Sequence, residues 1–230
     1  MTSLFDDAVT ERLRQAAPLA ELLRPRSLDE LVGQSHLIGP GGPLRRLVEA
    51  HNLSSMILWG PAGTGKTTLA RIMADSAGYA SESLSAVSSG VKDVREAIQR
   101  ARERLGERDQ RTVLFIDEVH RFNKSQQDLL LPATETGVIV LIGATTENPY
   151  FEVNAALMSR ATLWRLHPLT EDDLATLLRR GLDLRRAQID DEALEAITAA
   201  ADGDARAALT TLDTAIVLAR AEGEDRVTLE

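Results

Sequence analysis

The sequence predicts an α/β fold in which a parallel five-stranded sheet is flanked by helices and is followed by a small all-helical domain. Five short apolar runs alternate with helical periods up to about residue 167, which is typical of such sheets. A glycine-rich loop joins the first run to a helix. Beyond Pro168 the periodicity is helical only. We therefore expect one domain over residues 1–167 and a second over residues 168–230.

The expected elements follow in chain order. Strands are predicted at 56–59, 81–87, 112–116, 138–142 and 162–166, and helices at 9–16, 44–51, 68–77 and from 91 to about 105. In the second domain, Thr170 with Asp173 three residues on indicates a helix start, and we expect that helix to stop before Gly181. Two more helices are expected, from Asp190 to before Gly203 and from Asp204 to before Gly223.

Composition limits the function classes. The chain of 230 residues has no cysteine, which excludes a disulfide framework and a thiolate metal site. Its net charge of −9 excludes wholesale attraction to a polyanion, so any nucleic-acid contact must be local. Residues 1–7 lack the basic start of a signal peptide, and no apolar run reaches the roughly 18 residues of a membrane helix. We expect a cytoplasmic protein.

The glycine-rich loop satisfies G-x-x-x-x-G-K-[ST], with a strand before it and a helix after it. Glycines let backbone N–H groups turn toward phosphate oxygens, and the helix start adds a positive dipole end. Lys66 is expected on the β- and γ-phosphates, and the Thr67 hydroxyl on Mg²⁺. A chance glycine-rich turn would leave the Lys-Thr pair unexplained. The predicted phosphate-binding residues are Gly60, Pro61, Ala62, Gly63, Thr64, Gly65, Lys66, Thr67 and Thr68. The predicted ligands are therefore ATP, or another nucleoside triphosphate, and Mg²⁺.

Two further strand ends carry chemistry. Asp117 follows an apolar strand, where a carboxylate can hold Mg²⁺, and Glu118 beside it can act as general base toward an attacking water. An Asp-Glu pair alone is more often a turn that ends a strand, but the P-loop upstream favours the catalytic interpretation. Thr145 ends the next strand and could orient the water or sense the γ-phosphate, and Thr146 is an alternative for that role.

Other polar residues admit two interpretations each. Arg160 could be a finger that stabilises a neighbouring subunit's transition state, or a surface charge at a helix end. Arg206 could reach the P-loop from the second domain, or be a solvated first-turn arginine. The polar stretch from His120 to Gln127 could face a partner subunit or DNA, or be a solvated helix start.

With these residues in this order, the chain resembles AAA+ ATPases of the clamp-loader clade. The strings SMILWGPAGTGKTTLA, SAVSSGVKDVREAI, DEVHRFNKSQQD and IGATTENPYFEVNAALMSRA closely resemble the family of replication-associated recombination protein A and the Werner-helicase-interacting protein. The likeness covers about residues 18–225. Ala62 and Ala161 depart from the commoner proline and cysteine, and the departure at Ala62 should be harmless.

The resemblance implies roles for single residues. Glu118 would be the catalytic glutamate, Thr145 sensor 1, Arg160 the trans-acting finger and Arg206 sensor 2. The residues that would border the adenine are Arg24, Pro25, Val32 and Gly33.

The resemblance also implies a biological setting. It implies a DNA-dependent ATPase that acts in replication-fork maintenance and recombination at DNA ends and single-strand gaps, meets single-strand-binding protein, and lies at the nucleoid. Family members are tetramers through a C-terminal domain that this sequence lacks, so we expect an amino-terminal part of a longer protein.

Three alternatives stay open. A clamp-loader subunit or a branch-migration motor belongs to the same broad class, and a clamp-loader subunit would bind a sliding clamp. An ATP-gated scaffold with negligible hydrolysis belongs to another class, and the intact Asp117-Glu118 pair and Arg160 argue against it. A small-molecule kinase is disfavoured by the helical second domain and by the lack of an evident acceptor site.

Overall fold

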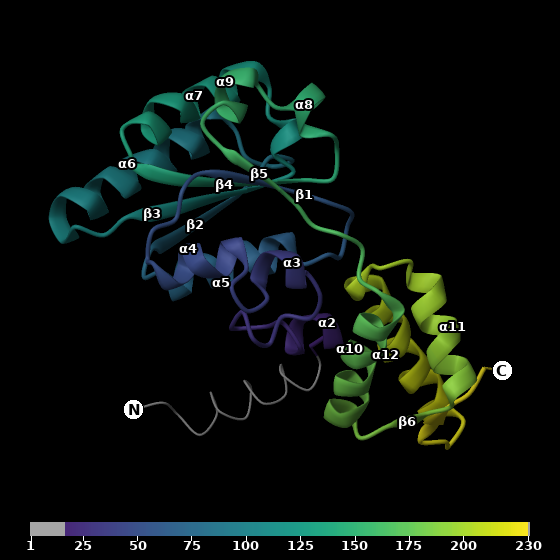
Figure 1. Ribbon diagram of the computed structural model, residues 1–230. Coiled ribbons are helices and arrows are strands. Elements are labelled where there is room, and N and C mark those ends of the chain that lie inside the picture. Colours follow the sequence, from purple (N-terminus) through teal and green to yellow (C-terminus); the bar gives the residue numbers. More distant parts are fainter. Residues whose placement is uncertain (1–16, 230) are drawn as a thin grey trace, which may run out of the picture. The chain divides into compact units, whose positions relative to one another are not determined.

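The computed structural model describes residues 17–229, which form two compact units (Figure 1). Pro25–Pro168 make up the first unit, and the described residues before Pro25 join those from Leu169 onward in the second. We call the first the core unit and the second the lid unit. The helix expected at 9–16 lies outside the described residues.

The core unit contains the sheet. Its strands are β1 (Met56–Trp59), β2 (Ala80–Ser85), β3 (Thr112–Asp117), β4 (Ile139–Thr145) and β5 (Thr162–Arg165). Its helices are α3 (Ser35–Ile38), α4 (Pro43–Glu49), α5 (Lys66–Ser76), α6 (Val91–Arg108), η1 (Val119–Arg121), α7 (Lys124–Glu135), α8 (Pro149–Glu152) and α9 (Ala155–Met158). All five predicted strands are confirmed, with ends that differ by up to three residues.

The five strands are parallel and lie in the order β2-β3-β4-β1-β5. The first strand in the chain thus lies between the last two, next to β4 and β5. This order brings the carboxyl ends of β1, β3 and β4 side by side. Parallel sheets of this kind bind ligands beyond those ends, near the strand where the order reverses.

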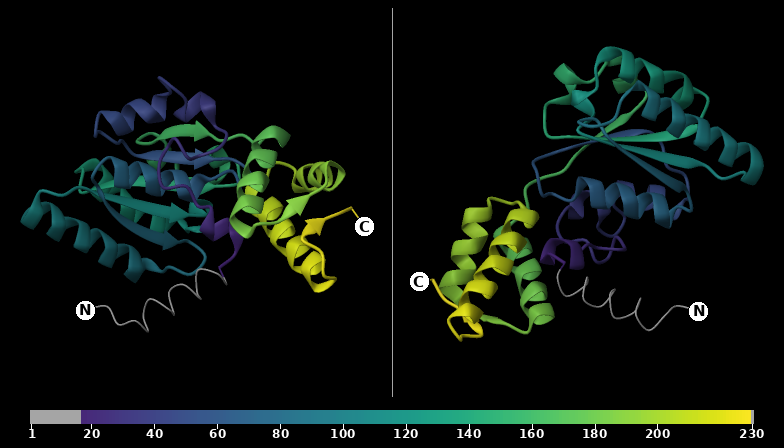
Figure 2. Two further views of the ribbon diagram at one scale, coloured as in Figure 1. Left: turned by 90° about the horizontal axis from the view of Figure 1, so that it is seen from below. Right: turned by 180° about the vertical axis from the view of Figure 1, so that it is seen from behind.

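Helices cover both faces of the sheet (Figures 1 and 2), and the three central strands β1, β3 and β4 are buried on both sides, whereas the edge strands β2 and β5 are partly exposed. Alternate residues of β1 enter two separate apolar clusters: Met56 and Leu58 pack with residues of α4 and α5, whereas Ile57 packs with residues of α6, α7 and α9. The same alternation holds in β3. The core is aliphatic, as the low aromatic content of 3% predicts.

The lid unit is mostly helical. It comprises α2 (Leu19–Leu22), α10 (Glu171–Arg185), α11 (Asp191–Ala201) and α12 (Ala205–Ala221), with a parallel pair of two-residue strands, β6 (Gln188–Ile189) and β7 (Arg226–Val227). The predicted caps are present at two starts, because the Thr170 hydroxyl accepts from the Asp173 N–H and the Asp204 carboxylate accepts from the N–H groups of Arg206 and Ala207.

Two features of the lid unit differ from expectation. Leu19, which the sequence assigned to the first domain, is fully buried in the lid unit, and its N–H donates to Asp213 on α12 at 3.1 Å. The helix expected to stop before Gly181 continues through it to Arg185. A Cβ at Gly181 would lie 3.1 Å from Leu212 Cδ2 and 3.3 Å from Leu19 Cδ1, so this glycine allows close packing rather than ending the helix.

In the described part of the chain, no helix combines the length and the apolar character needed to cross a membrane.

Candidate nucleotide-binding and catalytic site

The P-loop leaves the sheet at Gly60 and enters α5 at Lys66. A Cβ at Gly60 would lie 2.4 Å from the carbonyl oxygen of Leu166, so the close passage of β5 requires glycine there. Gly63 and Gly65 adopt left-handed backbone angles, with φ of 67° and 92°. Glycine adopts such angles without the strain that a Cβ causes, and they turn backbone N–H groups toward one centre.

The loop is tied together by its own side chains. Lys66 Nζ donates to the carbonyl oxygens of Gly60 at 2.8 Å and Pro61 at 2.7 Å, and the side chain is buried. The Thr64 hydroxyl, also buried, donates to the Pro61 carbonyl oxygen. The lysine is therefore held at the mouth of the loop. Thr67 and Thr68 follow in the first turn of α5, both half-buried, while Pro61 and Ala62 are exposed.

Neighbouring strand ends bring the other expected residues to the same edge. Trp59, the last residue of β1, pairs with Thr145 at the end of β4, and the Gly60 N–H donates to the Thr145 carbonyl oxygen at 3.2 Å. Asp117 ends β3, the strand on the other side of β4. The P-loop, the Asp117-Glu118 pair and Thr145 thus lie on three adjacent strands.

The acidic pair has a constrained backbone. Asp117 Oδ1 accepts the N–H of Glu118 at 3.2 Å, which closes the turn after β3. Glu118 has φ 55° and ψ 45°, the left-handed region. A residue with a Cβ pays about 1–2 kcal/mol for this conformation, and such strain clusters at functional sites. The side chain of Glu118 is 30% exposed, which gives water access to it.

The two threonines at the end of β4 have different surroundings. Thr145 is fully buried, and its hydroxyl contacts His120 Nδ1 at 2.9 Å and accepts the Glu147 N–H at 3.0 Å. Thr146 is exposed. The Thr145 hydroxyl is therefore engaged within the protein, while the Thr146 hydroxyl faces outward.

Arg160 lies at the opposite end of the sheet from the P-loop. It precedes β5, whose first residue Thr162 pairs with Met56 at the start of β1. Its Nε donates to Glu135 Oε1 at 2.8 Å. The P-loop of the same chain follows the other end of β1, so the length of that strand separates it from Arg160.

The remaining predicted residues divide between the two units, and in the core unit Gln34, next to Gly33, bonds His167 just beyond the carboxyl end of β5. Val32 and Gly33 precede α3 in the core unit, whereas Arg24 and Arg206 belong to the lid unit and Pro25 begins the core unit. Arg206 is exposed in the first turn of α12. Their roles stay predictions.

Part of the polar stretch after Glu118 is structural. Asn123 and Gln126 form a reciprocal cap at the start of α7. The buried Gln127 amide donates to the carbonyl oxygens of Phe122 and Glu152, which joins the start of α7 to α8. Arg121, Lys124 and Ser125 are exposed, as is the capping Asn123, so these residues of the stretch are accessible to a partner or to DNA.

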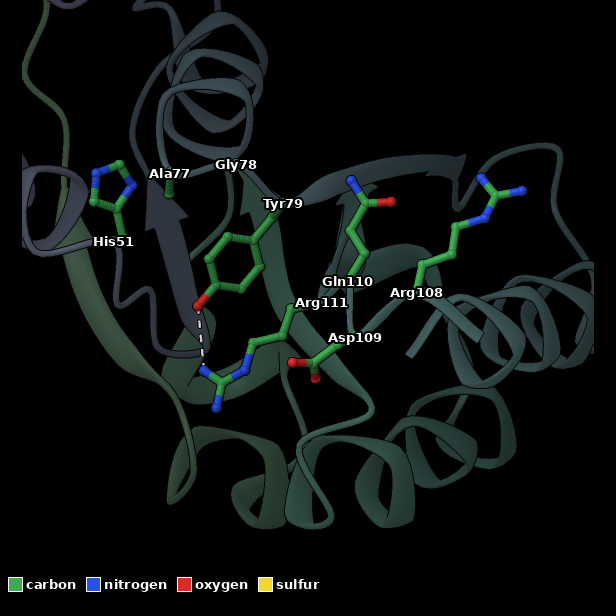
Figure 3. Close-up of a pocket in the computed structure, with 8 residues that line it drawn as sticks. All are labelled: His51, Ala77, Gly78, Tyr79, Arg108, Asp109, Gln110 and Arg111. Carbon is green, nitrogen blue, oxygen red and sulfur yellow. Dashed lines mark hydrogen bonds between the residues drawn. The ribbon is translucent and has the colours of Figure 1, made fainter. Parts of the chain in front are cut away.

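A separate pocket lies at the amino ends of β2 and β3, away from the P-loop (Figure 3). Its volume is about 470 Å³. In the close-up, the Arg111 side chain points to the Tyr79 hydroxyl, which its Nη1 contacts at 3.2 Å, while Arg108 points away from both. The basic side chains do not converge, and no predicted site residue lines this pocket.

The sequence placed His120 only in the polar stretch that could face a partner or DNA, and predicted no role for it beside Glu118, two residues before it. Its Nε2 is 3.3 Å from Glu118 Oε2. The only signal in the sequence was its position in the turn after β3. The sequence also did not predict that the Gln34 side chain would bond both the N–H and the carbonyl oxygen of His167.

Known proteins resemble this chain in sequence and in fold. The family model of the ATPase family associated with various cellular activities (AAA) matches residues 56–167. Replication-associated recombination protein A of Escherichia coli is 51% identical over 203 residues, which are 85% of this chain and 45% of that protein. ATPase WRNIP1 of Dictyostelium discoideum is 48% identical, over 87% of this chain and 23% of that protein. The chain thus spans less than half the length of these relatives.

Among solved structures, the Thermotoga maritima RuvB Holliday junction branch migration motor has a TM-score of 0.76. It is 30% identical to this chain, and the match covers 89% of this chain and 69% of RuvB.

Proposed function

This chain belongs to the AAA ATPase family, in the branch that contains replication-associated recombination protein A and ATPase WRNIP1. We propose that it is the ATP-hydrolysing part of a protein whose ATPase activity depends on DNA and which acts in replication-fork maintenance and recombination. The observation that supports this most is the meeting of the P-loop, the Asp117-Glu118 pair and the end of β4 on three adjacent strands. Phosphoryl transfer to water needs a phosphate cradle, a metal ligand and a base at one place.

The residues fit Mg²⁺ and ATP. A Cβ at Gly65 would meet nothing within 4 Å, so the loop leaves open space beside its inward-turned backbone. The Thr67 hydroxyl and the Asp117 carboxylate are hard oxygen donors of the type that Mg²⁺ prefers. Bound together, the metal and the nucleotide supply an electrophilic γ-phosphate. Lys66 would neutralise phosphate charge, once it exchanges the carbonyl oxygens of Gly60 and Pro61 for phosphate oxygens.

Glu118 would accept the proton of the attacking water. Its left-handed backbone directs the side chain from the turn after β3, and its partial exposure gives water access. Thr146 and Thr145 would divide the sensor role: the exposed Thr146 hydroxyl is free to meet the γ-phosphate, and the buried Thr145 supports the turn.

Arg160 would act in trans. Its place at the opposite end of the sheet from its own P-loop suits a guanidinium offered to a neighbouring subunit. Arg206 would sense the γ-phosphate from the lid unit, and Arg24, Pro25, Val32 and Gly33 would border the adenine. These assignments rest on the family resemblance.

The wider setting is also part of the proposal. We expect the intact protein to be a homotetramer that acts in the cytoplasm at the nucleoid, on DNA ends and single-strand gaps, beside single-strand-binding protein. The likeness to RuvB favours a second candidate, a Holliday junction branch migration motor. Branch migration of a synthetic four-way junction by the intact protein would favour this second candidate.

Steady-state ATP hydrolysis tests the main proposal. We expect gapped or end-bearing DNA to stimulate the intact protein, and Glu118→Gln to abolish turnover while nucleotide affinity is kept. Loss of turnover should exceed a hundredfold, because general-base catalysis contributes about 10²–10⁴-fold. Undiminished turnover in Glu118→Gln would remove Glu118 from the mechanism.

A further inference from the structure

The ring of His120 lies between two residues of the proposed site. Its Nδ1 is 2.9 Å from the Thr145 hydroxyl, and its Nε2 is 3.3 Å from Glu118 Oε2. The first distance is that of a hydrogen bond, and the second is a close N···O contact. One imidazole therefore touches the end of β4 with one nitrogen and the proposed general base with the other.

The protons on this ring follow from its neighbours. A carboxylate only accepts, so Nε2 carries a hydrogen where it faces Glu118. In the neutral ring Nδ1 is then an acceptor, and the Thr145 hydroxyl donates to it. The Thr145 oxygen also accepts the Glu147 N–H at 3.0 Å. The Thr145 proton has two acceptors within reach, His120 Nδ1 at 2.9 Å and the Glu147 carbonyl oxygen at 3.2 Å, and the contact to His120 is the shorter.

Burial makes this connection stiff. Thr145 has no exposed surface and the His120 side chain is 12% exposed, against 30% for Glu118. The backbone of Thr145 is also tied to the P-loop, because its carbonyl oxygen accepts the Gly60 N–H at 3.2 Å. A continuous set of contacts therefore runs from the first residue of the P-loop through Thr145 and His120 to Glu118.

Few other groups face the Glu118 carboxylate. Arg121 Nε lies 3.9 Å from Oε2, and the Arg121 side chain is 59% exposed, so that contact is screened by water. Of the two basic side chains beside this carboxylate in the described part of the chain, His120 is the nearer and the more buried. Without the ring, the exposed Arg121 would be the remaining ion-pair contact of this carboxylate among the described residues.

We propose that His120 is a positioning residue. It orients the Glu118 carboxylate and connects it, through Thr145, to the end of β4 and the P-loop. This inference rests on the proposed function, in which Glu118 activates water. A displaced base loses its approach to the attacking water, and an error of about 1 Å in such placement can cost about a hundredfold in rate.

Three substitutions separate positioning from packing. His120→Phe keeps a ring and removes both nitrogens. His120→Gln keeps a donor close to the place of Nε2, and His120→Asn keeps one close to the place of Nδ1. Turnover number, KM for ATP and the affinity for a fluorescent ATP analogue are measured in the intact protein with gapped DNA, together with melting temperature.

We expect His120→Phe to lower the turnover number by about tenfold to a hundredfold, with KM and nucleotide affinity unchanged. His120→Gln should recover part of that loss, whereas His120→Asn should not, because only the former keeps a donor to Glu118. In a double-mutant cycle on turnover, His120→Phe and Thr145→Val should be less than additive, since both interrupt one connection.

Turnover within twofold of the wild type in His120→Phe would overturn the inference, and so would equal losses in all three variants. If the phenylalanine variant melts early, the glutamine and asparagine variants carry the same test. Glu118→Gln separates this failure from failure of the proposed function. If it abolishes turnover while His120→Phe does not, only the inference about His120 falls.

Discussion

The guanidinium of Arg160 is bound by the carboxylate of Glu135, with 2.8 Å between Nε and Oε1. Nη1 of the same group donates to the Ala156 carbonyl oxygen and to the Ser159 hydroxyl. Arg160 lies next to the start of β1, and the P-loop follows the end of that strand, about 13 Å on at roughly 3.3 Å per residue. This position favours an arginine that contacts the nucleotide of a neighbouring subunit rather than that of its own chain.

Mixed assemblies test that arrangement. Arg160→Ala and Glu118→Gln should each be nearly inactive alone, because each removes one half of every site; arginine fingers contribute about 10³–10⁵-fold. Mixing the two variants should restore turnover, since some interfaces then pair an intact Glu118 with an intact Arg160. ATP hydrolysis is measured against the mixing ratio.

The control for the mixing experiment is Arg102→Ala, which removes an exposed arginine of α6 and should leave turnover unchanged. If mixed oligomers form and stay inactive, Arg160 does not act across an interface. Glu135→Gln should keep full turnover, because the resting ion pair must break before Arg160 can reach a phosphate.

Two glycines of the core unit predict opposite effects of alanine. At Gly60 a Cβ would lie 2.4 Å from a backbone oxygen of Leu166, which cannot move without displacing β5. Gly60→Ala should therefore lower both the melting temperature and nucleotide affinity. Gly106 lies inside α6 with open space around its Cα, so Gly106→Ala should stabilise by about 0.5–1 kcal/mol through helix propensity. Thermal melts of the two variants make the comparison, and a stable Gly60→Ala protein would contradict it.

Motif and periodicity could predict the strands, because β-branched runs and a P-loop are local signals. They could not predict that β1 lies between β4 and β5, since strand order depends on contacts between residues that are distant in the sequence. The place of Asp117 and Thr145 at one edge followed from the general rule for parallel sheets.

The contacts of the site were less accessible to sequence reasoning. His120 bonds Thr145, 25 residues later, only because β3 and β4 are neighbours. Gln127 looked like a solvated residue and is buried, because its amide satisfies two backbone carbonyls. Gly181 looked like a helix stop, but it provides space for Leu212. In each case a tertiary contact overrode the local signal.

An ion-pair cluster between β2 and α6 predicts a pH effect on stability. Glu82 bonds Arg100 through two nitrogens, at 3.0 and 2.8 Å, and also bonds Arg104. The hydrogen bond from Arg100 holds the pKa of Glu82 below its usual 4.5. A carboxyl whose pKa is lowered by folding stabilises the native state above its unfolded pKa and loses this contribution as pH falls through the folded one.

Glu82→Gln should therefore destabilise the protein by up to about 1 kcal/mol at pH 7, and less with each step below pH 4.5. Urea melts of the variant and the wild type at pH 7 and at a pH below 4.5 measure this difference in the free energy of unfolding. Asp75→Asn serves as the control, because the ion pair of Asp75 with Arg71 is exposed and 3.9 Å long. This variant should leave the free energy of unfolding unchanged at either pH. An effect of Glu82→Gln that does not shrink in acid would show that its charge is not the cause.

The last prediction separates the two threonines at the end of β4. Thr145→Val removes a buried hydroxyl that bonds His120 and the Glu147 N–H, and leaves both without their partner. It should cost about 1–3 kcal/mol of stability as well as turnover. Thr146→Val changes an exposed hydroxyl, so it should lower turnover on ATP with no change in melting temperature. Full activity of Thr146→Val would show that the Thr146 hydroxyl does not sense the γ-phosphate.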